Sequence, residues 1–193
     1  VRSRRQRQMC IRDRMNLDKD IMNKYKDCKD YSLADKYILS KMNTVVKEVT
    51  ENMEKFELGI AMQKVNDFMW TEFCDWYIEL VKSVFYGEDE KAKGVVYNVL
   101  STVLVTGLKL LHPAMPFITE EIFTHLTDEE TITTSSWPEY DESLLDEKAE
   151  SDMGYIIEAI KGLRNVRAEM NVPPSRKAKV ICYISDEAKE AFN

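Results

Sequence analysis

Apolar residues recur at steps of three and four along five segments of the chain, which is the spacing of one face of an α-helix. The predicted helices run from Ser32 to Phe56, from the corner at 57–59 to Gly87, from about Lys91 to Leu111, from Thr119 to about Leu126, and from about Glu147 to Met170. Ser32 is a good helix cap, and Asp35 three residues later completes a capping-box-like pair.

The third of these helices is apolar on nearly every side, so we expect it at the centre of the fold. The fifth should be buried through one stripe of apolar residues: Met153, Ile156, Ile157, Ile160 and Leu163.

Beyond the fifth helix, two prolines at 173–174 stop the helical pattern. Residues 177–184 alternate as in a strand, and the residues after them resemble the start of another helix. The sequence therefore predicts a mostly α fold, an antiparallel helical bundle followed by the start of a small α/β subdomain.

Composition supports a folded, helical chain. Hydrophobic residues make up 44% of the 193 residues, and there are only six Gly and five Pro. No uncharged apolar run reaches the roughly 18–20 residues that span a bilayer, so no membrane partner is predicted. The four cysteines do not pair at zinc-ligand spacing, and there are only two histidines, so no metal site is predicted.

Charge is unevenly distributed along a chain whose net charge is −7. Residues 1–14 hold six arginines against one aspartate, and residues 120–152 hold twelve acids against one lysine. Residues 161–179 hold six basic groups against one glutamate. Basic groups that share one face can bind nucleic acid even in an acidic protein, whereas a solvated surface is the other interpretation.

Signatures of unaided catalysis are missing, so no catalytic residue is predicted. The sequence has no GxGxxG, GxxxxGK[ST] or GxSxG motif, and its glycines are isolated. His112 stands at a predicted helix end without an acidic or cysteine neighbour in sequence, and we expect a packing or capping role for it.

Five blocks together resemble the anticodon-binding part of the class I valyl-tRNA synthetases. They are LADKYILSKMN at 33–43, EFCDWYIELVK at 72–82, LLHPAMPFITEEIF at 110–123, SSWPEYD at 135–141 and LRNVRAEMNVPPS at 163–175. The resemblance covers about residues 15–193. The related isoleucyl enzymes share such a bundle, so their anticodon-binding bundle is the nearest alternative.

This resemblance implies a division of the chain. Residues 1–14 do not fit the family and are interpreted as a non-native or disordered basic leader, with a basic RNA-binding arm as the rival interpretation. Residues 15–31 would be a linker from a missing catalytic domain, 32–172 the anticodon-binding bundle, and 173–193 the start of a truncated subdomain. The HIGH and KMSKS motifs are absent, so we expect no aminoacylation by this piece alone.

The resemblance also implies partners. A cytoplasmic module of this kind binds the anticodon stem-loop of tRNA(Val), and not DNA, while the enzyme's own catalytic domain uses ATP and Mg²⁺. No cofactor is expected in this piece. A helical protein-interaction scaffold without RNA binding remains the alternative from another functional class.

Two groups of residues suit such a task, because phosphates call for basic groups and unstacked bases for aromatic faces. On the first helix, Tyr37 stands one position off the apolar stripe beside Lys36 and Lys41, so it would stack on a base or pack at the bundle edge.

The second group is a basic stripe on the fifth helix, formed by Lys161, Arg164 and Arg167 at steps of three. Asn165 lies nearby, and Arg176 with Lys177 extends the basic surface beyond the prolines. The interpretations are contact with the tRNA backbone, or a salt-bridge network with Glu158, Glu169 and the acidic 139–152 segment.

Overall fold

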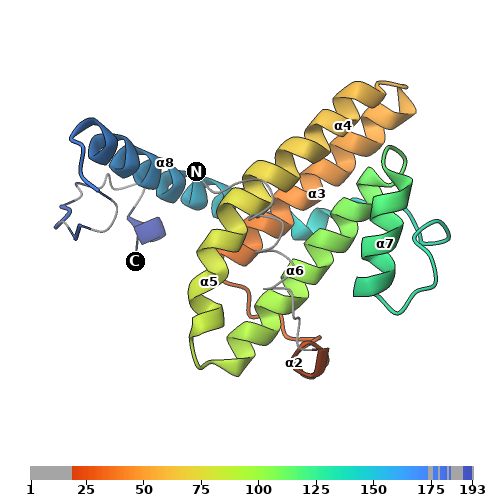
Figure 1. Cartoon of the computed structure of the whole chain (residues 1–193), viewed down its shortest axis with the longest axis horizontal. Helices are drawn as coiled ribbons and strands as arrows, with labels where there is room; N and C mark the ends of the chain where they lie inside the picture. The colour runs from red at the N-terminus through yellow and green to blue at the C-terminus, as the bar shows by residue number, and fades with distance from the viewer. Residues whose placement is uncertain (1–18, 174–175, 178, 182, 184–188, 193) are drawn as a thin grey trace.

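Three long helical rods lie side by side and form the centre of the molecule, as the computed structural model in Figure 1 shows. The structure describes residues 19–173, 176–177, 179–181, 183 and 189–192. Its elements are α2 (Lys19–Lys24), α3 (Leu33–Glu54), α4 (Leu58–Asp67), the π-helix η1 (Phe68–Tyr77), α5 (Ile78–Tyr86), α6 (Glu90–Leu111), α7 (Pro116–Leu126), the 3₁₀ turn η2 (Glu142–Leu144), α8 (Glu147–Glu169) and the 3₁₀ turn η4 (Glu190–Phe192). The predicted helical bundle is therefore confirmed.

The first rod, α3, begins as the sequence predicts. Ser32 accepts a hydrogen bond from the Asp35 backbone N–H, and the Asp35 carboxylate accepts one from the Ser32 N–H, which completes the capping box. The corner after α3 lies at 55–57 rather than at 57–59, because α4 already starts at Leu58. Phe56 makes this corner with a φ of 60°, a left-handed conformation that is uncommon for a bulky residue.

The second rod runs without a break from α4 through η1 to α5. Within η1 the helix is wider than an α-helix, and at its end the Ile78 N–H donates to the Phe73 carbonyl five residues earlier. Its buried residues include Phe68 and Phe73, which are five positions apart and still face the same core. The apolar stripe predicted the rod, whereas the π geometry was not predicted.

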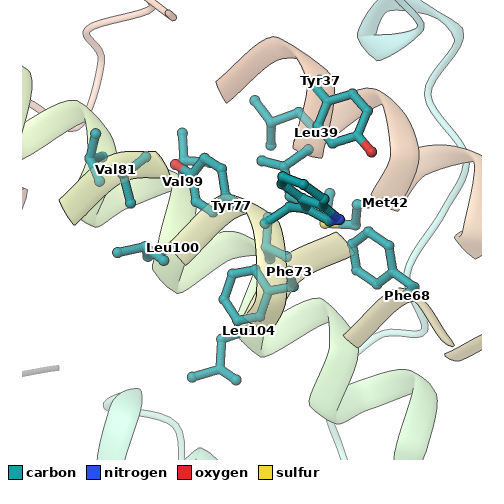
Figure 2. Close-up of a cluster of buried hydrophobic side chains, with 14 of the residues drawn as sticks. Tyr37, Leu39, Met42, Phe68, Phe73, Tyr77, Val81, Val99, Leu100 and Leu104 are labelled. Atoms are coloured by element: carbon teal, nitrogen blue, oxygen red, sulfur yellow. The ribbon is translucent and has the colours of Figure 1, made fainter. Parts of the chain in front are cut away.

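The third rod, α6, is the predicted central helix. Figure 2 shows Leu100 and Leu104 of α6 meeting Phe73 of η1, with Tyr37 and Met42 of α3 on the other side of the cluster. By length and composition α6 could also cross a membrane, contrary to the sequence expectation, but more than half of its apolar window is buried by the other helices. That burial is typical of the core helix of a bundle.

Close approach of two neighbours to α6 depends on glycine. A Cβ on Gly94 would lie 2.5 Å from the Tyr25 ring, and one on Gly107 would lie 2.4 Å from the Met69 sulfur. Through the first contact α2 docks on α6, where Asn98 also donates to the Met22 carbonyl at 3.1 Å. The segment assigned to a linker thus holds a helix tied to the bundle.

The last long helix, α8, packs against α3 with its first half and then leaves the bundle (Figure 1). Met153 and Ile157 are buried, whereas Leu163 is 38% exposed. The prediction that Leu163 is buried is therefore wrong, because among the described elements the long helices of the bundle do not cover this part of α8 and only the short turn η4 packs against the helix. The predicted strand at 177–184 falls partly outside the described residues, and the described ones there form no strand, since no strand in the described part of the chain lies ready to pair with it.

Candidate functional site

The basic stripe of α8 begins where this helix leaves the bundle, directly over the indole ring of Trp76 in η1. The Arg164 Cζ lies 5.5 Å from the centre of that ring, and the Lys161 Nζ lies 5.7 Å from it. Both distances are within the range of a cation–π interaction. The two cations thus converge on one aromatic side chain that is 85 or more positions away in sequence.

Within the described part of the chain, neither cation is neutralised by a carboxylate. Among the residues that the structure describes, Lys161 and Arg164 form no ion pair, whereas other lysines do, such as Lys41 with Glu150 at 2.6 Å. The salt-bridge interpretation with Glu158, Glu169 and the acidic segment is therefore wrong for these two residues. Both positions are exposed, so their positive charges face solvent.

Arg167 binds the chain that follows α8. Its Nη2 donates to the Pro173 carbonyl at 2.7 Å and to the Arg176 carbonyl at 2.9 Å. The guanidinium therefore holds the chain that turns back after α8 through its Nη2 atom. The turn leaves Arg176 and Lys177 exposed, and Asn165 on α8 is exposed as well.

Tyr37 does not lie on the surface, and the expectation that placed its ring on a polar flank is wrong. Only 4% of the residue is exposed, and its hydroxyl donates to the Glu72 carboxylate of η1. Burial, and then this carboxylate, raise the pKa of the Tyr37 phenol far above its usual range. The ring packs inside the bundle because η1 covers the flank of α3 that the sequence pattern left open.

Of the other two candidates on α3, Lys41 is paired and Lys36 is exposed. The Glu150 carboxylate of α8 binds the Lys41 ammonium and also accepts from the Ser40 hydroxyl at 2.6 Å. This cluster fastens α8 to α3. Lys36 remains a surface cation at the start of α3.

A second tyrosine–carboxylate pair joins the same two helices in the opposite direction. Tyr77 of η1 donates to the Asp35 carboxylate of α3 at 2.6 Å, and both groups are buried. Burial and the neighbouring Asp35 raise the pKa of the Tyr77 phenol well above its usual value. Two such pairs fix η1, and with it Trp76, against α3.

His112 has the predicted structural role. Its Nδ1 lies 2.8 Å from the hydroxyl of Thr119, which is buried in α7, so the ring ties the end of α6 to the next helix. In the part of the chain that the structure describes, no three His, Cys, Asp or Glu residues are grouped so that they could hold a metal ion.

Trp76 is a site residue that the sequence did not reveal, because its position in the 72–82 block gives it the helical spacing of a core residue. Trp76 is indeed only 8% exposed, but its ring face is turned to the two cations of α8. No local pattern reveals this pairing, because it depends on how α8 crosses η1.

Comparison with known proteins assigns the chain to a class. A family model described as the anticodon-binding domain of tRNA ligase matches residues 35–182, from the first turn of α3 to beyond the end of α8, and so includes both candidate groups. The chain therefore belongs to the anticodon-binding domain family of tRNA ligases.

The particular relatives are valine–tRNA ligases. The chain is 73% identical to the valine–tRNA ligase of Clostridium perfringens over 92% of its own length, and 66% identical to that of Clostridium acetobutylicum, also over 92%. The Bacillus anthracis valine–tRNA ligase is 45% identical over 81% of this chain. The chain spans about a fifth of the length of these relatives, 20% of the two clostridial proteins and 18% of the Bacillus protein. The isoleucyl alternative is not favoured by these similarities.

Proposed function

We propose that the chain is the part of a valine–tRNA ligase that holds the anticodon stem-loop of tRNA(Val). The family match and the valine–tRNA ligase relatives support this proposal. In such an enzyme the bundle keeps the tRNA in place while a catalytic domain, with ATP and Mg²⁺, joins valine to the far end. Since a tRNA ligase acts on the tRNA pool, we expect this work in the cytoplasm.

The single observation that supports the RNA-binding role is the pair of cations, Lys161 and Arg164, at the point where α8 leaves the bundle. Lys161 and Arg164 are exposed, lie over the ring of Trp76, and form no ion pair within the described residues. Free, positioned cations are what phosphate recognition needs, because each phosphate contact replaces condensed counterions. Asn165, Arg176 and Lys177 extend this surface.

The proposed contact set differs from the one that the sequence suggested. Lys36 stays in the proposed contact set as an exposed cation at the start of α3. Lys41 is paired with Glu150, so a phosphate would have to compete with that carboxylate for the Lys41 ammonium. Tyr37 is left out, since a ring that is 4% exposed has no face open to a base. Arg167 shapes the turn that presents Arg176.

Titration with RNA at several salt concentrations tests the proposal. The 193-residue chain should bind a tRNA with a valine anticodon, and the affinity should fall steeply as salt rises. In the Lys161→Ala/Arg164→Ala variant, the slope of log affinity against log salt should flatten by about one to two units, one for each lost phosphate contact.

The matched control is Lys26→Ala/Lys55→Ala, which removes the same charge from exposed positions on other elements. This control should leave the slope unchanged. Absence of salt-dependent binding by the unaltered chain would instead favour the protein-interaction scaffold.

A further inference from the structure

Trp76 combines burial with an unusual set of neighbours. Only 8% of the residue is exposed, as in a core side chain, yet Lys161 and Arg164 both lie over its ring. We propose that Trp76 is a positioning residue for tRNA binding, whose indole face holds these two side chains in the orientation in which they meet phosphates. The inference rests on the proposed function.

The helix spacing explains why one ring serves two cations. Lys161 and Arg164 are three positions apart, so they lie on neighbouring turns of α8 and their side chains reach the same spot. A lysine or arginine free in water samples many rotamers, and phosphate binding must freeze them. Contact with the indole restricts this motion in advance, because the negative face of the ring attracts both cations.

The positive charges of Lys161 and Arg164 stay available for a ligand, because an indole ring attracts a cation without neutralising it. A carboxylate partner would neutralise the charge. Lys41 shows the other case, since its ammonium lies 6.0 Å from the Tyr37 ring but is also paired with Glu150. A phosphate that approached Lys41 would have to compete with this carboxylate. At Lys161 and Arg164 there is no such competitor among the described residues.

The ring itself is fixed by the π-helix that carries it. Tyr77, the next residue, donates to the buried Asp35, and Glu72, one turn earlier, accepts from Tyr37. Both anchors lie on α3, so η1 cannot rotate about its axis without breaking them. The Trp76 face therefore stays directed at α8.

The test compares two tryptophans of the same π-helix in the 193-residue chain. Trp76→Leu removes the aromatic face but keeps an apolar side chain, and Trp70→Leu makes the same change where no cation lies over the ring in the described structure. A tRNA with a valine anticodon is titrated at several salt concentrations, after circular dichroism has established that each variant is folded.

For Trp76→Leu we expect the affinity at a fixed salt concentration to fall by about tenfold, because two long side chains must now be ordered on binding. The salt slope should stay unchanged, since both cations remain to meet phosphates. Trp70→Leu should change neither quantity. In a Lys161→Ala/Arg164→Ala background, the Trp76→Leu change should have no further effect on affinity, whereas a merely structural role would add its loss.

Two results would overturn the inference while the proposed function stands: equal effects of Trp76→Leu and Trp70→Leu, or full additivity with the Lys161/Arg164 changes. If the unaltered chain does not bind this tRNA at all, both the inference and the proposed function are wrong. Should Trp76→Leu fail to fold, Trp76→Phe against Trp70→Phe gives the same comparison, with a smaller loss of about threefold, since phenylalanine attracts cations less strongly than tryptophan.

Discussion

At the residue scale, the most informative feature is the exchange of phenols and carboxylates between α3 and η1. Each helix donates one tyrosine hydrogen bond to the other and accepts one from it. Tyr37 of α3 donates to Glu72 of η1, and Tyr77 of η1 donates to Asp35 of α3. A buried carboxylate is stabilised by such a donor, and a hydrogen bond to a charged group contributes about 1.5–3 kcal/mol. The pairs therefore define how the two helices align.

The raised pKa values of both phenols predict a loss of stability at high pH. In the unfolded chain a tyrosine loses its proton near pH 10, whereas the folded state keeps Tyr37 and Tyr77 protonated beyond that point. The folded state thus binds more protons above pH 10, and the free energy of unfolding should decrease there by about 1.4 kcal/mol per pH unit for each phenol. Urea unfolding between pH 8 and pH 11 measures this dependence.

Tyr77→Phe should reduce that slope by the share of one phenol, while lowering stability at pH 7 through the lost bond to Asp35. The matched control is Tyr86→Phe, at a residue that is 80% exposed, and it should leave the slope as it is. A slope that is the same in Tyr77→Phe and in the unaltered chain would contradict the prediction.

Arg167 permits a second prediction at this scale. Arg167→Ala should speed hydrogen exchange of the backbone amides at 170–172 and 176–177, because two carbonyl contacts that hold the turn are lost. Arg167→Lys should not restore protection fully, since both hydrogen bonds are donated by Nη2 and the shorter lysine side chain places its ammonium nearer the backbone than that atom. If exchange in this turn is unaffected by Arg167→Ala, the guanidinium does not hold it.

At the scale of elements, spacing predicted the existence of the long helices well and their finer geometry poorly. The capping box of α3 and the span of α6 follow from residue types that act locally. The π geometry of η1 and the left-handed backbone of Phe56 do not follow from local residue types, because both depend on how the neighbouring helices pack. Helix α2 was missed because its six residues carry no repeated stripe, and contacts with α6 stabilise it instead.

Gly94→Ala should therefore detach α2 without unfolding the bundle. The added Cβ would overlap the Tyr25 ring, and such overpacking typically costs about 1–3 kcal/mol. Limited proteolysis should cut the 19–31 segment faster, while the circular dichroism of the bundle stays nearly unchanged. Gly154→Ala is the matched control, since nothing lies within 4 Å of its new Cβ and the helix should gain about 0.5–1 kcal/mol. Equal proteolysis of the two variants would show that Gly94 does not control the docking.

At the scale of the whole molecule, the bundle is a closely packed unit, and the second half of α8 extends from it. This arrangement limits what sequence could say about the candidate site. The basic stripe was recognised because its residues share one helix, whereas the burial of Tyr37 and the role of Trp76 depend on contacts between α3, η1 and α8. Contacts of that kind are set by the packing of whole helices, not by a local pattern.

The same arrangement predicts a gradient of hydrogen-exchange protection. Amides of α6 should exchange slowest, since its side chains form the centre of the core, and those at 161–169 should exchange much faster because the side chains there are mostly exposed. Addition of a tRNA with a valine anticodon should slow exchange at 161–169 and leave α6 unchanged. Protection that appears only on α7 would place the RNA elsewhere.

The outer part of α8 has a mechanical consequence. From Lys161 to the end of the helix at Glu169 the rod extends about 12 Å, at 1.5 Å per residue. A rod held at one end acts as a lever, and here the fulcrum is the indole of Trp76. A tilt of about 10° displaces the far tip by about 2 Å, whereas Arg164, about 4.5 Å from Lys161 along the axis, moves by about 0.8 Å. Any loosening at this pivot is therefore amplified along the arm, and it is passed on to Arg176 and Lys177 through the bond between Arg167 and the Arg176 carbonyl.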